Sequence, residues 1–84
     1  MKIVLLPRFE REFKRLPTDI KKLAETKEKL FRVDPFDPRL KTHKLHGEME
    51  EFWSFSLNYK YRVIFTFQNE ATAIFYSIGS HDIY

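Results

Sequence analysis

The sequence predicts an α+β domain in which a short strand and two helices precede a three-stranded antiparallel sheet. Two different periods in the hydrophobic pattern carry this prediction. Apolar residues recur every three to four positions between Phe9 and Phe31, as on one face of a helix, and every two positions from Phe52 onward, as on one face of a strand. Because the 84 residues show no linker and no repeat, we expect a single domain spanning residues 1–84.

The N-terminal segment predicts a strand that leads directly into a helix. Residues Lys2–Leu6 are mostly apolar, and Pro7 both ends this strand and suits the first position of a helix. The apolar residues that follow recur at helical spacing with charged residues between them: Phe9, Phe13 and Leu16. We therefore expect an amphipathic helix of about two to three turns.

A second helix is predicted after a tight joint, so that the two helices form a hairpin. Pro17-Thr18-Asp19 breaks the first helix and is typical of a helix start. The apolar face of the second helix consists of Ile20, Leu23, Ala24, Leu30 and Phe31. Lys27 interrupts this face, and its stem can lie along apolar surface while its amino group reaches water.

The C-terminal half predicts three antiparallel strands. A loop with two prolines, residues 34–38, separates them from the helices, and a polar, basic stretch, residues 39–47, follows it. The first expected strand alternates polar residues with Trp53, Phe55, Leu57 and Tyr59, the second spans Tyr61–Gln68, and the third spans Ala71–Ile78. The turns at 59–60 and 69–70 are short enough to make this a meander. With the helices on one sheet face, the other face should be free to meet a ligand.

Composition narrows the classes of function. The chain has no Cys, which excludes disulfides and thiolate chemistry and permits a reducing cytosol. Its longest apolar run is Ile3–Leu6, far below the roughly 20 residues of a membrane span, and its start lacks the apolar region of an export signal. We therefore expect a cytoplasmic protein without membrane contact. No glycine-rich phosphate loop and no recognised ligand spacing indicates a cofactor or a metal.

Charge is distributed unevenly along the chain. The net charge is +3, but residues 1–33 carry ten Lys or Arg against five Asp or Glu, whereas residues 34–84 carry five against seven. A basic half is compatible with a phosphate-rich partner. A solvated helical surface is the alternative, and charge alone does not choose between the two.

Three side chains outside the helices have the chemistry needed to cut RNA without a metal. In that reaction the 2′-OH attacks its own phosphate while a base takes its proton, an acid protonates the leaving 5′-oxygen and a cation stabilises the charge on phosphorus. His43 is the candidate base and His81 the candidate acid, because imidazole titrates near working pH. Arg62 is the candidate phosphate clamp, and strand alternation places it on the face opposite to Val63.

Each candidate also has a purely structural interpretation. His81 can be a surface histidine near the C-terminus, and Arg62 can form an ion pair across strands. Further candidates would bind substrate rather than react with it: Lys41, Lys44, Lys60 and Tyr84. The lysines can touch the RNA backbone or only be solvated, and the tyrosine can stack on a base or anchor the terminus to the sheet.

Four segments taken in order resemble a known family. They are Phe9–Ile20, Pro38–Gly47, Phe52–Phe65 and Ile78–Tyr84. Together they resemble the RelE/ParE superfamily of toxins, most closely its RelE and YafQ branch, over nearly the whole chain. The resemblance implies a RelE-like fold and the toxin of a type II toxin–antitoxin pair. Such a toxin cuts mRNA in the ribosomal A site without a metal until a cognate antitoxin binds it, so the implied partners are mRNA, ribosomal RNA and that antitoxin.

The same resemblance assigns roles to individual residues. His43 falls on a catalytic histidine of the YafQ branch, and His81 falls on the C-terminal catalytic histidine of that branch. Arg62 falls on the strand arginine that RelE-like members use at the phosphate. Tyr84 falls near the C-terminal aromatic residue that orients the substrate.

The sequence departs from the YafQ pattern in two places. Ser56 and Lys60 stand where that branch has further catalytic His and Asp residues, and one residue fewer separates His81 from the terminal aromatic residue. Two other functions therefore stay open beside the endoribonuclease. One is a ParE-type gyrase inhibitor, which needs no pair of histidines, and the other is a catalytically inactive member that serves as an antitoxin-binding module. The oligomeric state is not predicted.

Overall fold

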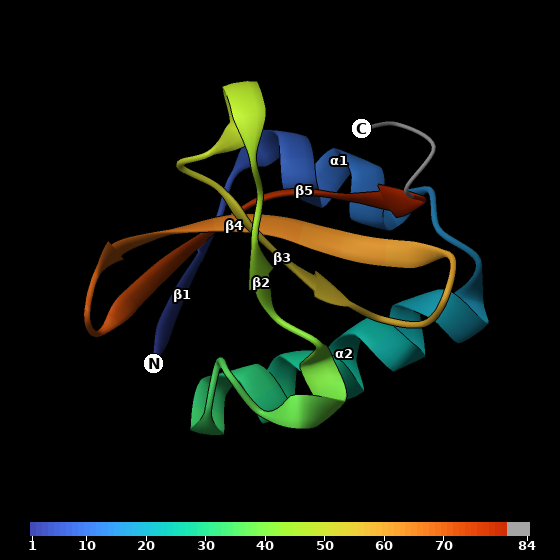
Figure 1. Ribbon diagram of the computed structural model, residues 1–84. Coiled ribbons are helices and arrows are strands. Elements are labelled where there is room, and N and C mark those ends of the chain that lie inside the picture. The colour runs from blue at the N-terminus through green and yellow to red at the C-terminus, as the bar shows by residue number, and fades with distance from the viewer. Residues whose placement is uncertain (81–84) are drawn as a thin grey trace.

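The computed structural model describes residues 1–80, with every side chain in that range except that of Met49. Its elements are β1 (Lys2–Leu5), α1 (Pro7–Lys14), α2 (Thr18–Val33), the 3-10 turn η1 (Pro38–Leu40), β2 (His43–Lys44), the 3-10 turn η2 (Gly47–Met49), β3 (Trp53–Ser56), β4 (Tyr61–Asn69) and β5 (Thr72–Ser80). Figure 1 shows α2 along one side of the sheet and α1 beside β5. The predicted α+β class is therefore confirmed.

The strands form one mixed sheet with the order β1-β5-β4-β3-β2. β4 is antiparallel to both β3 and β5, which confirms the predicted meander. At one edge β1 lies parallel to β5, and at the other β2 pairs antiparallel with β3. The sequence does not indicate β2, because two residues within a polar, basic stretch are too few to show an alternation.

Both predicted helices form close to their expected bounds. α1 begins at Pro7. The N–H groups in the first turn of a helix have no acceptor within the helix, so a proline, which lacks this group, loses no hydrogen bond there. α2 begins at Thr18, directly after Pro17, and ends where Asp34 adopts an extended backbone before Pro35. The proline positions therefore set both the start of each helix and the end of the second.

The ring of Phe31 holds α2 on the sheet. Its side chain is completely buried, and its ring centroid lies 5.2 Å from that of Phe55, 4.9 Å from that of Phe65 and 5.1 Å from that of Phe75. These three rings come from β3, β4 and β5, and two of the contacts are edge-to-face, which is a favoured geometry for aromatic pairs. One helical residue thus contacts the whole meander.

A β-bulge in β5 keeps the core continuous. The register between β4 and β5 shifts at Tyr76, which has no partner on β4. An extra residue of this kind reverses the alternation beyond it. Phe75 before the bulge and Ile78 after it are therefore both buried in the core, although they are three residues apart. A regular strand would have turned one of them away from the helices.

The sheet face opposite to α2 is not wholly open. Its central residues pair across three strands and are completely buried: Ser54, Ile64 and Ser77. Phe52 and Tyr76 lie on either side of β4 with their ring centroids 5.0 Å apart, so the two rings meet over this strand. The expectation of a free face is therefore wrong at the centre, and the accessible part lies toward Arg62.

α1 closes the edge of β5 where β1 ends. The last backbone bond between the two strands runs from the Leu6 N–H to the Phe75 carbonyl, over 3.2 Å. Beyond it, a carboxylate oxygen of Glu12 accepts the Ile78 N–H over 3.2 Å and the Ser77 hydroxyl over 2.8 Å. A side chain of α1 therefore takes over the hydrogen-bonding role of the missing strand.

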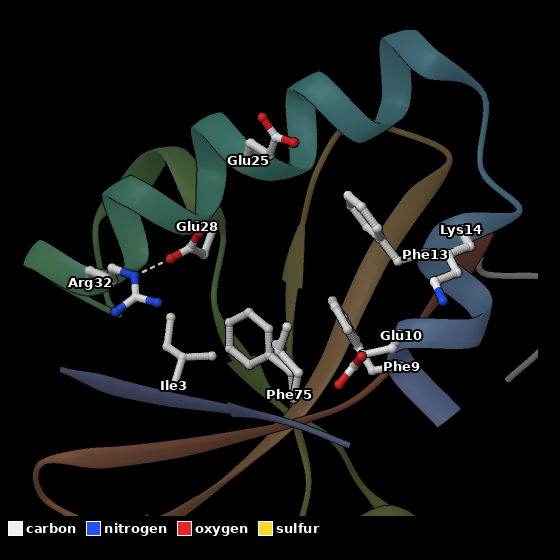
Figure 2. Close-up of a pocket in the computed structure, with 10 residues that line it drawn as sticks. Ile3, Phe9, Glu10, Phe13, Lys14, Glu25, Glu28, Arg32 and Phe75 are labelled. Atoms are coloured by element: carbon white, nitrogen blue, oxygen red, sulfur yellow. Dashed lines mark hydrogen bonds and ion pairs between the residues drawn. The ribbon is translucent and has the colours of Figure 1, made fainter. Parts of the chain in front are cut away.

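An apolar groove of about 380 Å3 separates the two helices above β1. Figure 2 shows Ile3, Phe9, Phe13 and Phe75 around the space between α1 and α2. Charged side chains lie around the groove: Glu10, Lys14, Glu25, Glu28 and Arg32. The predicted helical hairpin thus has the expected tight joint, but its two helices diverge over the sheet.

Replacing Phe31 by Ala should lower the free energy of unfolding by about 3–5 kcal/mol, since the ring is lost and a cavity forms between three strands. Urea unfolding followed by circular dichroism measures this change. The matched control is Phe36→Ala, because this ring is 53% exposed and its loss should cost only roughly 1 kcal/mol. Equal losses in the two variants would contradict the central place given to Phe31.

Replacing Glu12 by Ala should destabilise the protein by about 1–3 kcal/mol, because it leaves the Ile78 N–H at the sheet edge without its acceptor. Glu12→Gln should recover most of the loss, since its amide oxygen still accepts. The exposed Glu25→Ala on α2 should stay within about 0.5 kcal/mol of the parent. Amide hydrogen exchange at Ile78 should rise in Glu12→Ala alone, and unchanged exchange would exclude the edge-closing role.

Candidate functional site

Strand register places His43 and Arg62 on the same face of the sheet. His43 pairs with Ser54, and Arg62 pairs with Ser56, two residues further along β3. Directly paired residues, and residues two apart on one strand, point to the same side of a sheet. Two strand spacings and two residues along the strand put the two Cα atoms roughly 12 Å apart.

Arg62 has small neighbours on both adjacent strands. Ser56 on β3 and Gly79 on β5 pair directly with it. Neither residue carries a side chain large enough to cover the guanidinium on this face. Arg62 itself is half-buried, so part of its side chain is accessible.

The backbone next to His43 favours one tautomer of its ring. The Nδ1 atom of His43 lies 3.1 Å from the carbonyl oxygen of Lys41. A carbonyl only accepts, so this contact is a hydrogen bond when Nδ1 carries the proton. In the neutral ring Nε2 then has the free lone pair, and the exposed imidazole presents it as a base.

A hollow of about 250 Å3 lies at the end of the sheet that carries Arg62. Four of its lining residues are cationic: Lys27, Arg39, Lys41 and Arg62. The others are Ser56, Leu57, Asn58, Tyr59 and Tyr61. Among the residues that the structure describes, no carboxylate side chain lines this cationic pocket. Its chemistry suits an anion with several oxygen atoms.

One of the four cations is held by a neighbouring carboxylate. The guanidinium of Arg39 donates to Asp37 through Nε over 3.0 Å and through a terminal nitrogen over 2.8 Å. This side-chain bond, together with the Arg39 backbone N–H, lowers the pKa of Asp37 to about 2, and the pKa of Arg39 is raised in return. Asp37 therefore stays ionised and offsets the charge of Arg39, while it also caps η1.

The remaining predicted site residues are placed differently. Lys44 pairs with the core-facing Trp53, so register puts it on the face opposite to His43. The exposed Lys60 lies in the turn between β3 and β4, with its amino group 5.5 Å from the centroid of the Tyr61 ring. His81 and Tyr84 lie outside the described residues. The structure thus brings together Lys41, Arg62 and the face of His43, and it separates Lys44 from them.

The pocket residues that the sequence-based candidates lack include two cations and the exposed aromatic residue: Lys27, Arg39 and Tyr59. Lys27 gave a signal, because it interrupts an apolar helical face. The alternation predicts that Tyr59 continues the first strand of the meander, but it lies in the turn after β3 and is 91% exposed. Arg39 gave no signal of its own in a stretch where several residues are basic.

The part of the chain that the structure describes contains neither a cluster of metal-binding side chains nor a membrane-spanning helix. Within residues 1–80, no three His, Cys, Asp or Glu side chains gather where they could hold a metal ion. None of the helices in this range is long and apolar enough to cross a membrane.

Solved structures with low sequence identity share the fold. A YoeB/ParE toxin from Agrobacterium tumefaciens is 16% identical with a TM-score of 0.80, and the match covers 96% of this chain and 99% of that chain. YafQ from E. coli strain BL21(DE3) is 14% identical with a TM-score of 0.75, covering 98% and 94%. A YoeB–YefM complex from Staphylococcus aureus gives 16% identity and a TM-score of 0.77, covering 96% and 97%.

The fold is that of RelE-like toxins of type II toxin–antitoxin systems. The family described as "Bacterial toxin of type II toxin-antitoxin system, YafQ" matches residues 1–83, and the chain belongs to this family. No curated protein sequence matches the chain. The sequence-based assignment to the RelE and YafQ branch is thereby confirmed.

Proposed function

We propose that this toxin is a metal-independent, ribosome-dependent endoribonuclease that cuts mRNA by attack of a 2′-OH on the adjacent phosphate. The observation that carries the proposal is the register that brings His43 and Arg62 to one face of the sheet. Membership of the YafQ toxin family supports it, since the resemblance to that family implies cleavage of mRNA.

Each step of the cleavage has a candidate residue. His43 takes the 2′ proton through Nε2, because its Nδ1 is directed at the Lys41 carbonyl. Arg62 binds the non-bridging phosphate oxygens and stabilises the charge that builds on phosphorus. His81, beyond the described residues, gives a proton to the leaving 5′-oxygen. One proton is taken and one is given, and the products are a cyclic 2′,3′-phosphate and a 5′-hydroxyl.

The departures from the YafQ pattern make this a reduced site. Ser56, beside Arg62, has a hydroxyl that does not act as a base near neutral pH. Lys60 brings a positive charge where the pattern has a carboxylate. With fewer catalytic groups, the toxin depends more on having the phosphodiester held in place, and a ribosome supplies such positioning for the codon in its A site.

Single substitutions test the catalytic assignment. His43→Ala, Arg62→Ala and His81→Ala should each reduce cleavage of translated mRNA, by about 10²- to 10⁴-fold for the two acid–base residues and about 10²- to 10³-fold for the arginine. Primer extension on mRNA after induction measures the cleavage, and growth curves measure toxicity. The control is Lys29→Ala, on an exposed position of α2, which should cut mRNA like the parent.

The other outcomes separate the alternative functions. Unchanged toxicity in variants that fold normally by circular dichroism would falsify the catalytic proposal. Intact mRNA together with DNA damage after induction would favour a gyrase inhibitor. No growth effect from the parent protein, together with tight antitoxin binding, would favour an inactive binding module.

We also propose that a cognate antitoxin covers the groove between α1 and α2. The similar toxin from Staphylococcus aureus is in complex with YefM, which makes an antitoxin the partner to expect. The groove exposes apolar side chains to water, including Leu5, which is 44% exposed. An exposed apolar surface of this kind is typical of a protein interaction site. Charged groups of both signs around it suit an amphipathic segment with its own Lys and Glu residues.

Replacing Leu5 by Lys should weaken antitoxin binding at least tenfold, because the new charge enters the apolar part of the groove. Isothermal titration with the cognate antitoxin measures the affinity. Val33→Lys is the matched control, since Val33 is 88% exposed and does not line the groove. Equal affinities in both variants would exclude the groove as the binding surface.

A further inference from the structure

The most exposed large apolar side chain in the described part of the chain stands beside the cationic pocket. Tyr59 is 91% exposed in the turn between β3 and β4, and it is one of the residues that line the pocket. The turn is well defined, because the side-chain oxygen of Asn58 accepts the backbone N–H groups of Lys60 over 2.9 Å and Tyr61 over 2.8 Å. A rigid turn therefore holds an aromatic ring out in solvent next to positive charge.

Lys27 reaches the same pocket from the apolar side of α2. Its amino group donates to the carbonyl oxygen of Arg39 over 3.3 Å, which ties the end of its side chain to η1. This bond uses one of three ammonium protons, so the amino group can still donate to an anion. A lysine in the middle of an apolar helical face is unexpected for packing alone, and its long stem allows it to bring a charge to the pocket.

The charges around the pocket do not cancel. Asp37 offsets Arg39, but the positive charges of Lys27 and Lys41 remain, and no carboxylate lines the pocket within residues 1–80. Cations placed together in this way repel one another, which an arriving anion relieves. Cationic side chains beside an exposed aromatic ring are the combination by which proteins bind single-stranded nucleic acid, with phosphate on the charges and a base on the ring.

We propose that Lys27, Lys41 and Tyr59 form a subsite for one RNA nucleotide next to the bond that is cut. The phosphate lies in the cationic pocket and the base stacks on Tyr59. Arg62 links this subsite to the catalytic face, because it lines the pocket and also stands on the face of His43. The inference rests on the proposed function in taking RNA as the substrate, but it concerns binding and can be tested without cleavage.

The test measures binding of a labelled single-stranded RNA whose 2′ positions are all O-methylated, so that it cannot be cut. Tyr59→Ala should weaken binding by roughly 5- to 150-fold, as expected for the loss of one stacked base. Lys27→Met keeps the stem and removes the charge, so it should weaken binding and reduce the slope of log affinity against log salt by about 0.7. Fluorescence anisotropy over a salt series gives both quantities.

Two controls match these variants in chemistry. Phe36→Ala removes another exposed ring that does not line the cationic pocket, and Lys29→Met removes another charge from α2. Both should bind the RNA within about twofold of the parent, because neither touches the subsite. Circular dichroism verifies that all four variants fold.

Several results would overturn the subsite. These are RNA affinities of Tyr59→Ala and Lys27→Met equal to the parent, equal losses in the control variants, or no binding by the parent at low salt. Loss of binding in Lys27→Met alone, with equal competition by inorganic phosphate, would reduce the pocket to a simple anion site and also overturn it. If cleavage depends on His43 while both subsite variants bind RNA normally, the proposed nuclease function is supported and the subsite is excluded. If both subsite variants bind RNA more weakly but the parent protein cuts no mRNA, the subsite is supported and the nuclease function is excluded.

Discussion

The contact of Phe31 with three neighbouring strands is the interaction on which the rest of the structure depends. It is the only large side chain of α2 that is completely buried within the described residues, and its ring meets rings from β3, β4 and β5. In a chain of 84 residues the buried core is small, so losing one such contact removes a large share of the stability. Because Phe31 fixes α2 to one side of the meander, the opposite side is left to the candidate catalytic residues.

The short β1 explains the place of α1 and the groove beside it. β1 pairs with β5 only up to the middle of that strand, and Glu12 then serves the next free N–H of β5. α1 must therefore lie along the sheet edge rather than against the length of α2. The groove between the helices follows from this requirement, since the side chains of a two-turn helix at the edge do not fill the space. A surface suited to a partner is thus a consequence of how the edge is closed.

Local patterns were enough to predict most of the fold, and contacts between distant segments account for the rest. The helices, the three long strands and the face of Arg62 follow from spacing within a few residues. The parallel pairing of β1, the two residues of β2 and the bulge at Tyr76 depend on partners elsewhere in the chain, so no local period reveals them. The same holds for the site. The sequence identifies Lys41 as a candidate cation, but only the folded chain shows that it shares a pocket with Lys27 and Tyr59.

Core packing and the cationic pocket are coupled through α2. Lys27 precedes Phe31 by four residues, and residues four apart lie one above the other on the same face of a helix. The packing of the Phe31 ring against the strands therefore also fixes where the Lys27 side chain leaves α2 and in which direction it points. With Phe31 in the core, the amino group of Lys27 reaches the Arg39 carbonyl of η1. Lys27 interrupts the apolar face of α2, but it is not a defect in the helix. The packing that stabilises the fold also places the amino group of Lys27 at the proposed binding pocket.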